Sequence, residues 1–262
     1  STLTLIDRCV KMIEEQTGEK IDPSLLEDGD KKTYELFSTG KTNGVFQFES
    51  DGMKDVLRRF KPDRLGHLTA LNALYRPGPM QMIDDFVKRR HGQTKVTYEH
   101  PSFETILGET YGIMVYQEQV MQIAAAIAGF TMGEADMLRQ AMGSKRSRER
   151  MERLHQRFAD GAGERGVTPE VIEIIWEKLA AFASYGFPES HSVSFAYLVY
   201  ASSWLKRWYP AAFCAALLDA QPMGFYAPHT LVQDARRHGV EVRTPDLNAS
   251  AATAALEGVG VG

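Results

Sequence analysis

Three short segments of the sequence carry side chains suited to binding anions. In the first, Arg76-Pro-Gly-Pro79, two prolines fix the backbone around a permissive glycine, so the turn must be stiff. A guanidinium held by such a turn can present its fork of N–H donors to phosphate oxygens. An arginine at the end of a helix can instead bond the last carbonyl groups, and the residues alone leave both interpretations open.

A second group of cations surrounds Gly143. Arg139 precedes this glycine, and three further cations follow it, namely Lys145, Arg146 and Arg148. A glycine break between two helices allows such side chains to converge on a triphosphate or on a nucleic-acid backbone. The alternative is a solvated helix face. We favour phosphate binding at this break.

The third segment runs from Tyr185 to Ser192. Ser190 and His191 open a predicted helix, where first-turn N–H groups, a hydroxyl and an imidazole together attract an anion. A simple N-cap with a surface histidine explains the same residues, and it is the preferred interpretation of this segment taken alone. Tyr185 and Phe187 flank Gly186 in the preceding loop, where both rings are candidates to stack on nucleic-acid bases.

A further basic segment, Lys54 to Arg64, lies in a chain whose net charge is −4. A basic cluster in a chain without an overall positive charge suggests a surface that meets phosphates, although a solvated helix face remains the alternative. The candidate DNA-binding side chains are Lys54, Arg58, Arg59, Lys61 and Arg148.

Residue patterns for bond-making chemistry are absent from the sequence. It contains no Gly-x-Ser-x-Gly, His-Glu-x-x-His, Walker A or dinucleotide-binding motif. The carboxylate pairs Glu14-Glu15 and Asp84-Asp85 are sequence neighbours, which point in different directions on a helix and do not readily share one metal ion. We therefore expect neither a catalytic residue nor a metal site in this chain.

The composition indicates a globular protein of one large domain or two smaller ones. The chain has 262 residues, of which 44% are hydrophobic and 24% charged. Its two cysteines, Cys9 and Cys214, are far apart in the sequence and favour a reduced intracellular compartment. The longest apolar stretch, Val193 to Leu205, is shorter than the roughly 20 residues that span a bilayer. With no recognisable signal peptide, we expect a cytoplasmic protein that does not enter a membrane.

Helical periodicity dominates the sequence, so the anion-binding segments are predicted at helix ends and in the loops between helices. Ile113 to Tyr116 is predicted to be extended, and Val240 to Arg243 is a candidate strand. One face of the helix after Thr168-Pro169 should carry Val171, Ile174, Ile175, Leu179 and Phe182. The expected helices are the following: one that ends at Gly18, then 33–37, 53–60, 65–75, 117–128, 132–142, 144–161, one that begins after Thr168, then 190–209, 211–218 and 229–238.

Several ordered blocks of the sequence resemble the bacterial C-family replicases, which comprise the DNA polymerase III alpha subunit and its error-prone relatives. The blocks are Gly44 to Met53, Ala73 to Pro79, Tyr111 to Met121, Ala135 to Gly143 and Phe182 to Phe187. The resemblance implies a mainly α, multi-helix fingers domain with few short strands. It places the fingers domain in residues 1–220, with residues 1–10 next to the palm domain, and an outer fingers subdomain with the start of the following region in residues 221–262.

The resemblance also implies a function in DNA replication or error-prone repair synthesis. In this family the fingers close over the incoming deoxynucleoside triphosphate and guide template-primer DNA, while three palm aspartates hold two magnesium ions. The third aspartate belongs to a Lys-x-Asp-Phe-Leu-Gly-Leu run that should end just before Ser1, so we expect this segment alone to be inactive as a nucleotidyltransferase. The implied partners are the palm of the same chain, a sliding clamp and other replisome subunits, at the bacterial nucleoid.

By resemblance, Arg139 matches an arginine near the triphosphate, and Arg76, Ser190 and His191 sit in motifs around the family's active site. The position of the family's frequent second arginine is occupied by Gln140 here.

The first 140 residues are more similar to the replicative branch, and later segments to the error-prone branch. The replicative branch usually has Asn-Lys where this chain has Pro188-Glu189, and a glutamate there would weaken attraction for phosphate. A free-standing helical module that binds nucleic acid or a protein partner is the alternative function.

Overall fold

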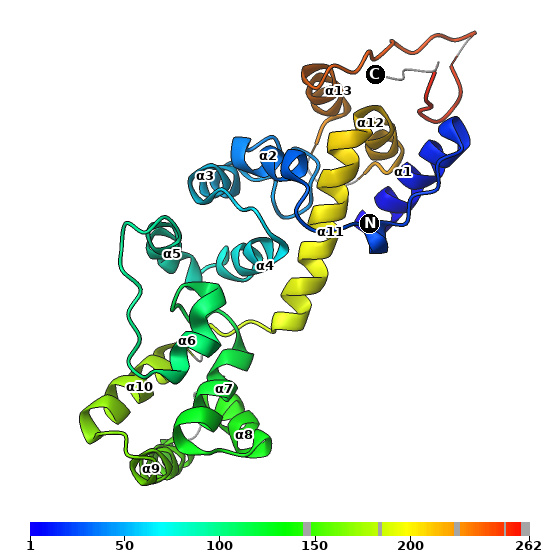
Figure 1. Ribbon diagram of the computed structural model, residues 1–262. Coiled ribbons are helices and arrows are strands. Elements are labelled where there is room, and N and C mark those ends of the chain that lie inside the picture. The colour runs from blue at the N-terminus through cyan, green and yellow to red at the C-terminus, as the bar shows by residue number, and fades with distance from the viewer. Residues whose placement is uncertain (144–147, 183–184, 223–225, 249, 258–262) are drawn as a thin grey trace. The chain divides into compact units, whose positions relative to one another are not determined.

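The computed structural model describes residues 1–143, 148–182, 185–222, 226–248 and 250–257, and in these ranges nearly all regular secondary structure is helical. The described residues form thirteen α-helices and three short 3-10 helices (Figure 1). Strand pairing within the described ranges amounts to one isolated parallel bridge between Tyr116 and Phe187. The predicted mainly α fold is therefore confirmed.

The chain divides into two compact units that do not follow chain order. Unit 1 combines residues 1–68 with residues 194–262, and unit 2 is the continuous stretch 69–193. Two helices have residues in both units, α4 (Leu65–Leu74) and α11 (Glu189–Trp208). The resemblance implies a domain boundary near residue 220. In the structure, residues after 220 instead belong to the same unit as residues 1–68. The expected outer subdomain over 221–262 stays a prediction.

Unit 1 is built from helices at both ends of the chain. Besides its parts of α4 and α11, it contains α1 (Thr2–Thr17), η1 (Pro23–Leu25), α2 (Lys31–Thr39), α3 (Asp51–Phe60), α12 (Pro210–Asp219) and α13 (Pro228–Arg237). Helix α1 packs against α12, and α12 against α13. Leu5, Cys9 and Ile13 of α1 share one buried cluster with Phe213 and Leu217 of α12. The two ends of the chain thus build one hydrophobic core.

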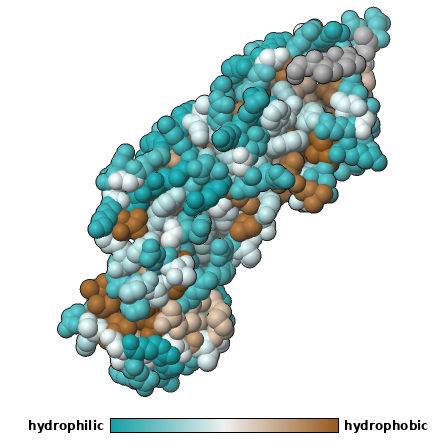
Figure 2. Space-filling model, in the orientation of Figure 1, coloured by the Kyte–Doolittle hydropathy of each residue, from teal (hydrophilic) through white to brown (hydrophobic). Residues whose placement is uncertain are grey.

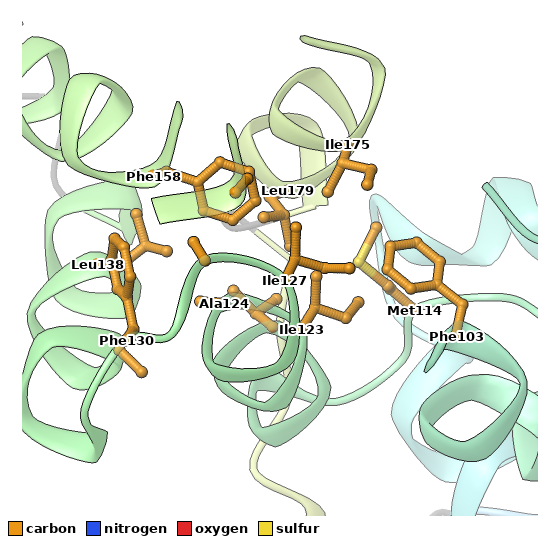
Figure 3. Packing of buried hydrophobic residues seen from close by; sticks show 14 of the residues in the cluster. Phe103, Met114, Ile123, Ala124, Ile127, Phe130, Leu138, Phe158, Ile175 and Leu179 are labelled. Carbon is orange, nitrogen blue, oxygen red and sulfur yellow. The ribbon is translucent and has the colours of Figure 1, made fainter. Parts of the chain in front are cut away.

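Unit 2 contains most of the predicted anion-binding residues. Its helices are η2 (Pro79–Met82), α5 (Ile83–Arg90), α6 (Ser102–Leu107), η3 (Gly108–Thr110), α7 (Gln117–Ala128), α8 (Met132–Gly143), α9 (Arg148–Glu164) and α10 (Pro169–Phe182). Helix α7 packs against α6, α8 and α9. Its Ile123 and Ile127 lie among Phe103, Phe158 and Leu179, which come from three other helices (Figure 3). Helix α7 is therefore the central helix of this core.

Local sequence signals fix the ends of the helices around the site. Gly129 ends α7 in the left-handed conformation, with φ of 63°, which glycine adopts without strain. Thr131 and Glu134 then form the predicted capping box at the start of α8: the Thr131 N–H donates to Glu134 Oε2 at 2.8 Å, and the Glu134 N–H to Thr131 Oγ1 at 3.2 Å. Such a cap contributes on the order of 1 kcal/mol.

Two sequence predictions about local structure are wrong. Residues 240–243 form no strand, because a short apolar and charged run gains strand structure only from a partner strand. Ile174 is exposed rather than part of the buried face of α10, which carries Ile172, Ile175, Leu179 and Phe182. These four buried residues are separated by three, four and three positions, which follows the helical period of about 3.6 residues better than the predicted set that included Ile174.

The described surface is mainly polar. Figure 2 shows that hydrophilic residues cover most of the displayed face and that hydrophobic residues appear on it in separate groups. Among the described residues, no helix combines the length and the apolar character needed to cross a membrane.

Candidate functional site

Arg76 lies at the centre of a contact between two of the predicted anion-binding segments. Its Nε donates to the Ala73 carbonyl oxygen and its Nη2 to the Tyr185 carbonyl oxygen, both at 2.8 Å. The guanidinium also lies over the Phe187 ring, 4.4 Å from the ring centroid. Partial burial lowers the pKa of Arg76, but an arginine stays charged in any protein environment. Arg76 thus fastens the loop of residues 185–187 to the end of α4.

The Pro-Gly-Pro turn is shaped to receive Tyr185. Gly78 has φ of 101°, a backbone conformation that other residues rarely adopt. A Cβ atom at Gly78 would lie 2.4 Å from Cε1 of Tyr185, so the tyrosine ring rests directly on the glycine backbone. The turn predicted to be stiff, Arg76-Pro-Gly-Pro79, therefore packs directly against the Tyr185 ring.

The same loop is fixed to the start of α7. The Gln117 N–H donates to the Phe187 carbonyl oxygen at 3.1 Å, and this bond belongs to the parallel bridge between Tyr116 and Phe187. A Cβ atom at Gly186 would meet Gln117 Cβ at 3.3 Å, so this loop approaches α7 closely. The Phe187 ring also lies 5.4 Å from the His191 ring, centroid to centroid. Phe187 therefore contacts Arg76, Gln117 and His191, which come from three different parts of unit 2.

Arg139 is held by groups on α8 and α7. Its Nε and Nη2 donate to Asp136 Oδ1 at 2.9 and 2.7 Å, and its Nη1 donates to Gln117 Oε1 at 3.4 Å. The Arg139 side chain is 33% exposed and that of Asp136 is 41% exposed. The guanidinium is thus partly covered, already paired with a carboxylate, and still accessible to solvent.

The start of α11 already binds a carboxylate of the chain itself. The Glu189 N–H donates to Glu118 Oε2 at 2.9 Å. Burial raises the pKa of Glu189, and the negative charge of Glu118 raises it further. Ser190 and His191 are exposed, whereas Ser192 is buried and donates to the Thr69 carbonyl oxygen at 2.6 Å. The first N–H of this helix thus already has a carboxylate oxygen as its acceptor.

The structure thus brings together Arg76, Tyr185, Phe187, His191 and, through Gln117, Arg139. We call these five residues with Gln117 the unit 2 site. Lys145 and Arg146 lie outside the described residues, and the side chain of Arg148, at the start of α9, is also outside them.

The predicted DNA-binding cations on α3 belong to unit 1. Lys54 is only 14% exposed, lies 3.7 Å from Asp51 and donates to Asn43 Oδ1 at 2.6 Å. Arg58 and Arg59 are exposed; Arg58 Nε donates to the Thr39 carbonyl oxygen at 3.4 Å, and Arg59 pairs with Asp55 at 2.9 Å. Lys61 caps the C-terminus of α3 in the left-handed conformation and is exposed. Three of these four predicted DNA-binding cations therefore remain accessible to a phosphate backbone.

Comparison with known proteins gives the family of the chain. A model of the bacterial DNA polymerase III alpha subunit finger domain matches residues 2–166, which is more than half of the chain. The chain belongs to this finger domain family. The finger domain has the mainly helical architecture expected from the resemblance.

Curated relatives of this finger domain are named error-prone DNA polymerases. The Nocardia farcinica protein is 49% identical over 98% of the chain, the Mycobacterium tuberculosis protein 50% over 95%, and the Corynebacterium glutamicum protein 47% over 95%. The matches span 23%, 23% and 24% of those relatives, so the chain covers about a quarter of their length. They extend beyond residue 166 and include the loop of residues 185–187.

Sequence reasoning about the finger domain missed the polar partners of its arginines. Asp136 precedes Arg139 by three residues on one helix, and this spacing is a signal for an ion pair that could have been used. Gln117 and Glu118 offered no such signal, because their contacts with Arg139 and Glu189 depend on how α7, α8 and α11 pack. Gln140, at the position of the family's second arginine, donates to Asp136 Oδ2 at 2.7 Å.

Proposed function

We propose that the chain is the fingers segment of a bacterial DNA-directed DNA polymerase, and that it binds the triphosphate of the incoming deoxynucleoside triphosphate and the template-primer DNA. The proposal covers synthesis during replication or error-prone repair. Family membership supports the polymerase context, and the names of the relatives favour the error-prone branch. The substrates are inferred from the chemistry of the unit 2 site.

The continuity of the unit 2 site carries this proposal. Arg139, Gln117, Phe187 and Arg76 come from distant parts of the sequence and are joined by successive contacts of 3.4, 3.1 and 4.4 Å. A guanidinium and a helix start favour phosphate oxygens. The neighbouring aromatic loop favours a base. A nucleotide presents both kinds of group at once, so one ligand satisfies the whole site.

Individual residues have different roles in this proposal. Arg139, Ser190 and His191 bind phosphate, together with Lys145 and Arg146, while Arg58, Arg59, Lys61 and Arg148 contact the DNA backbone. Tyr185 and Phe187 are the stacking residues. Arg76 supports phosphate binding by holding their loop, and Lys54 supports the DNA-binding segment through its bond to Asn43.

The complete polymerase requires further parts. Two-metal phosphoryl transfer needs Mg²⁺ held by carboxylates, and the described residues include no group of three His, Cys, Asp or Glu side chains that could hold a metal ion. We therefore assign no magnesium site to them and propose that the palm domain of the same polymerase holds the ions. The sliding clamp and other replisome subunits are proposed partners of the complete protein, which we place at the nucleoid.

Replacement of Arg139 tests the proposed function. In a complete polymerase that carries this segment, Arg139→Gln should raise the KM for deoxynucleoside triphosphates by about tenfold, because one charge-assisted phosphate contact is lost. Lys88→Gln removes an exposed cation from α5 of the same unit and should leave KM unchanged. Equal KM values for Arg139→Gln and the unaltered protein would contradict nucleotide binding at this site.

A titration of DNA binding in the presence and absence of triphosphate distinguishes this function from that of a free-standing nucleic-acid-binding module. The module would bind DNA in a salt-sensitive manner without competition from triphosphates. The proposed finger domain, combined with its palm, would show competition by triphosphate that is lost in Arg139→Gln.

A further inference from the structure

Asp136 accepts hydrogen bonds from the guanidinium of Arg139 in the way that a phosphate group would. One carboxylate oxygen accepts two N–H groups of Arg139 at 2.9 and 2.7 Å, and the other accepts Gln140 Nε2 at 2.7 Å. The hydrogen bond from Arg139 holds the pKa of Asp136 below its ordinary value, so this carboxylate is negatively charged at neutral pH. Both side chains are partly exposed, which gives another anion access to the arginine.

Glu118 does the same at the start of α11. Its Oε2 accepts the Glu189 N–H at 2.9 Å, the kind of first-turn donor that binds phosphates in other proteins. Its Oε1 lies 3.4 Å from Gln117 Nε2. Burial raises the pKa of Glu189, and the nearby charge of Glu118 raises it further.

Gln117 connects the two carboxylates. Its Oε1 accepts Arg139 Nη1 at 3.4 Å, and its Nε2 donates to Glu118 Oε1 at 3.4 Å. Asp136, Arg139, Gln117, Glu118 and the first N–H of α11 thus form one chain of polar contacts within unit 2. Each positive group in this chain is matched by a carboxylate of the protein.

We propose that Asp136 and Glu118 are internal substitutes for the phosphate groups of the nucleotide: they bind Arg139 and the start of α11 before the triphosphate arrives, and the triphosphate displaces them. This inference rests on the proposed function, because it concerns the same site. The carboxylates keep the donors hydrogen-bonded and oriented in the absence of nucleotide. They also lower nucleotide affinity, because binding exchanges one anion for another instead of adding a new ion pair.

Two nearly isosteric substitutions test the effect of the negative charge of each carboxylate separately from its hydrogen bonds. Asp136→Asn and Glu118→Gln keep a carbonyl oxygen that can accept the bonds from Arg139 and from the Glu189 N–H, but they remove the negative charge that competes with phosphate. Each should lower the KM for deoxynucleoside triphosphates about three- to tenfold in a complete polymerase that carries this segment. The pair should be non-additive, because Gln117 contacts both halves.

Asp85→Asn is the matched control. Asp85 pairs with Arg89 at 2.8 Å on α5 of the same unit, so this variant removes a carboxylate from an arginine outside the site, and its KM should equal that of the unaltered protein. Thermal unfolding of every variant shows whether the fold is kept, and nucleotide binding by a folded Asp136→Asn protein can be measured by equilibrium titration independently of turnover.

The outcomes distinguish the inference from the proposed function. A lower KM in Asp136→Asn and Glu118→Gln, but not in Asp85→Asn, supports internal substitution. An unchanged or higher KM in both folded variants overturns it, since the carboxylates would then only orient their partners. If Arg139→Gln leaves KM unchanged, the proposed function itself fails. If Arg139→Gln raises KM while the carboxylate variants do not lower it, only the internal substitution fails.

Discussion

At the scale of single residues, Arg76 illustrates how an arginine can serve a site without meeting its ligand. The sequence left open whether this guanidinium faces phosphate or the end of its own helix. In the structure it bonds the carbonyl oxygens of Ala73 and Tyr185 and stacks on Phe187. A lysine would lose both the planar fork and the stacking. The position of the aromatic loop therefore depends on the shape of this side chain as well as on its charge.

Gly78 gives the first prediction at this scale. A methyl group there would lie 2.4 Å from Cε1 of Tyr185 and 2.6 Å from its Cδ1, so Gly78→Ala must displace the ring in addition to straining the backbone. We expect a loss in the free energy of unfolding of about 2–4 kcal/mol, measured by urea denaturation.

Gly92→Ala is the control, because Gly92 also has a positive φ, 68°, but no neighbouring atom within 4 Å of the added Cβ. It should cost about 1–2 kcal/mol. In a Tyr185→Ala background the cost of Gly78→Ala should fall, because only the backbone strain then remains. Equal costs for Gly78→Ala with and without the Tyr185 ring would show that the ring does not rest on this glycine.

Glu189 gives the second prediction. It lies beside Glu118, and burial together with the charge of that neighbour raises its pKa. Glu189→Lys removes a repulsion between like charges and allows an ion pair with Glu118, but it also places a cation at the positive end of a helix, which costs a similar amount, so the free energy of unfolding should change by less than about 0.5 kcal/mol. The KM for deoxynucleoside triphosphates in a complete polymerase should fall, because the lysine attracts phosphate where the glutamate repels it.

Glu189→Gln separates the loss of a negative charge from the gain of a positive one. It should reproduce part of the change in KM. If Glu189→Lys and the unaltered protein bind nucleotide equally well, residue 189 has no electrostatic influence on the phosphate site.

At the scale of secondary-structure elements, two glycines of α9 should respond to alanine in opposite directions. A Cβ atom at Gly161 would lie 2.1 Å from the Ala128 carbonyl oxygen at the end of α7, whereas none lies within 4 Å of one at Gly163. Gly161→Ala should therefore force the two helices apart and cost about 1–3 kcal/mol. Gly163→Ala should stabilise the protein by about 0.5–1 kcal/mol, because alanine is the better helix former.

Urea denaturation of the two variants checks this prediction, and each serves as the control for the other, since both place the same residue in the same helix. Stabilisation by both substitutions would mean that α7 and α9 do not pack closely at Gly161. In that case the core around Phe158 and Ile127 would have to be held by side chains alone.

The helices were largely predictable because their signals are local. The range of α7, the glycine cap at Gly129 and the capping box of Thr131 and Glu134 all follow from neighbouring residues. The failure at residues 240–243 has the opposite cause, since a strand depends on a distant partner. The site was predictable only as separate segments. Their junction at Phe187 and Gln117, and the partners of Arg139, depend on packing that no local spacing encodes.

At the scale of the whole molecule, unit 1 joins residues that are far apart in the sequence through a buried ion pair. Lys206 on α11 is 3% exposed and donates to Asp234 Oδ2 on α13 at 2.6 Å and to the Asn43 carbonyl oxygen at 2.7 Å. Asp234 also accepts Asn43 Nδ2 at 2.9 Å. Three distant segments thus meet at one pair of charges, which fixes the position of α13 in unit 1.

This pair makes the stability of unit 1 sensitive to acid. Burial alone would raise the pKa of Asp234, but the charge and hydrogen bond of Lys206, together with Asn43 and His238, hold it below its ordinary value. A carboxylate with a lowered pKa in the folded state contributes stability that is complete above its unfolded pKa of about 4. That contribution is lost as the pH falls through the lowered value, so urea midpoints should be constant from pH 7 to about pH 5 and should decrease below about pH 4.

Tryptophan emission can assign this loss to unit 1, because Trp204 and Trp208 lie in unit 1 and Trp176 in unit 2. With Trp176→Phe as background, Asp234→Asn should cost about 3–5 kcal/mol at pH 7, since it leaves a buried ammonium group without its carboxylate. It should also flatten the decrease below pH 4. Asp7→Asn removes an exposed partner of Lys11 and should cost less than about 0.5 kcal/mol. Parallel pH profiles for Asp234→Asn and its parent would mean that other carboxylates govern the acid unfolding of unit 1.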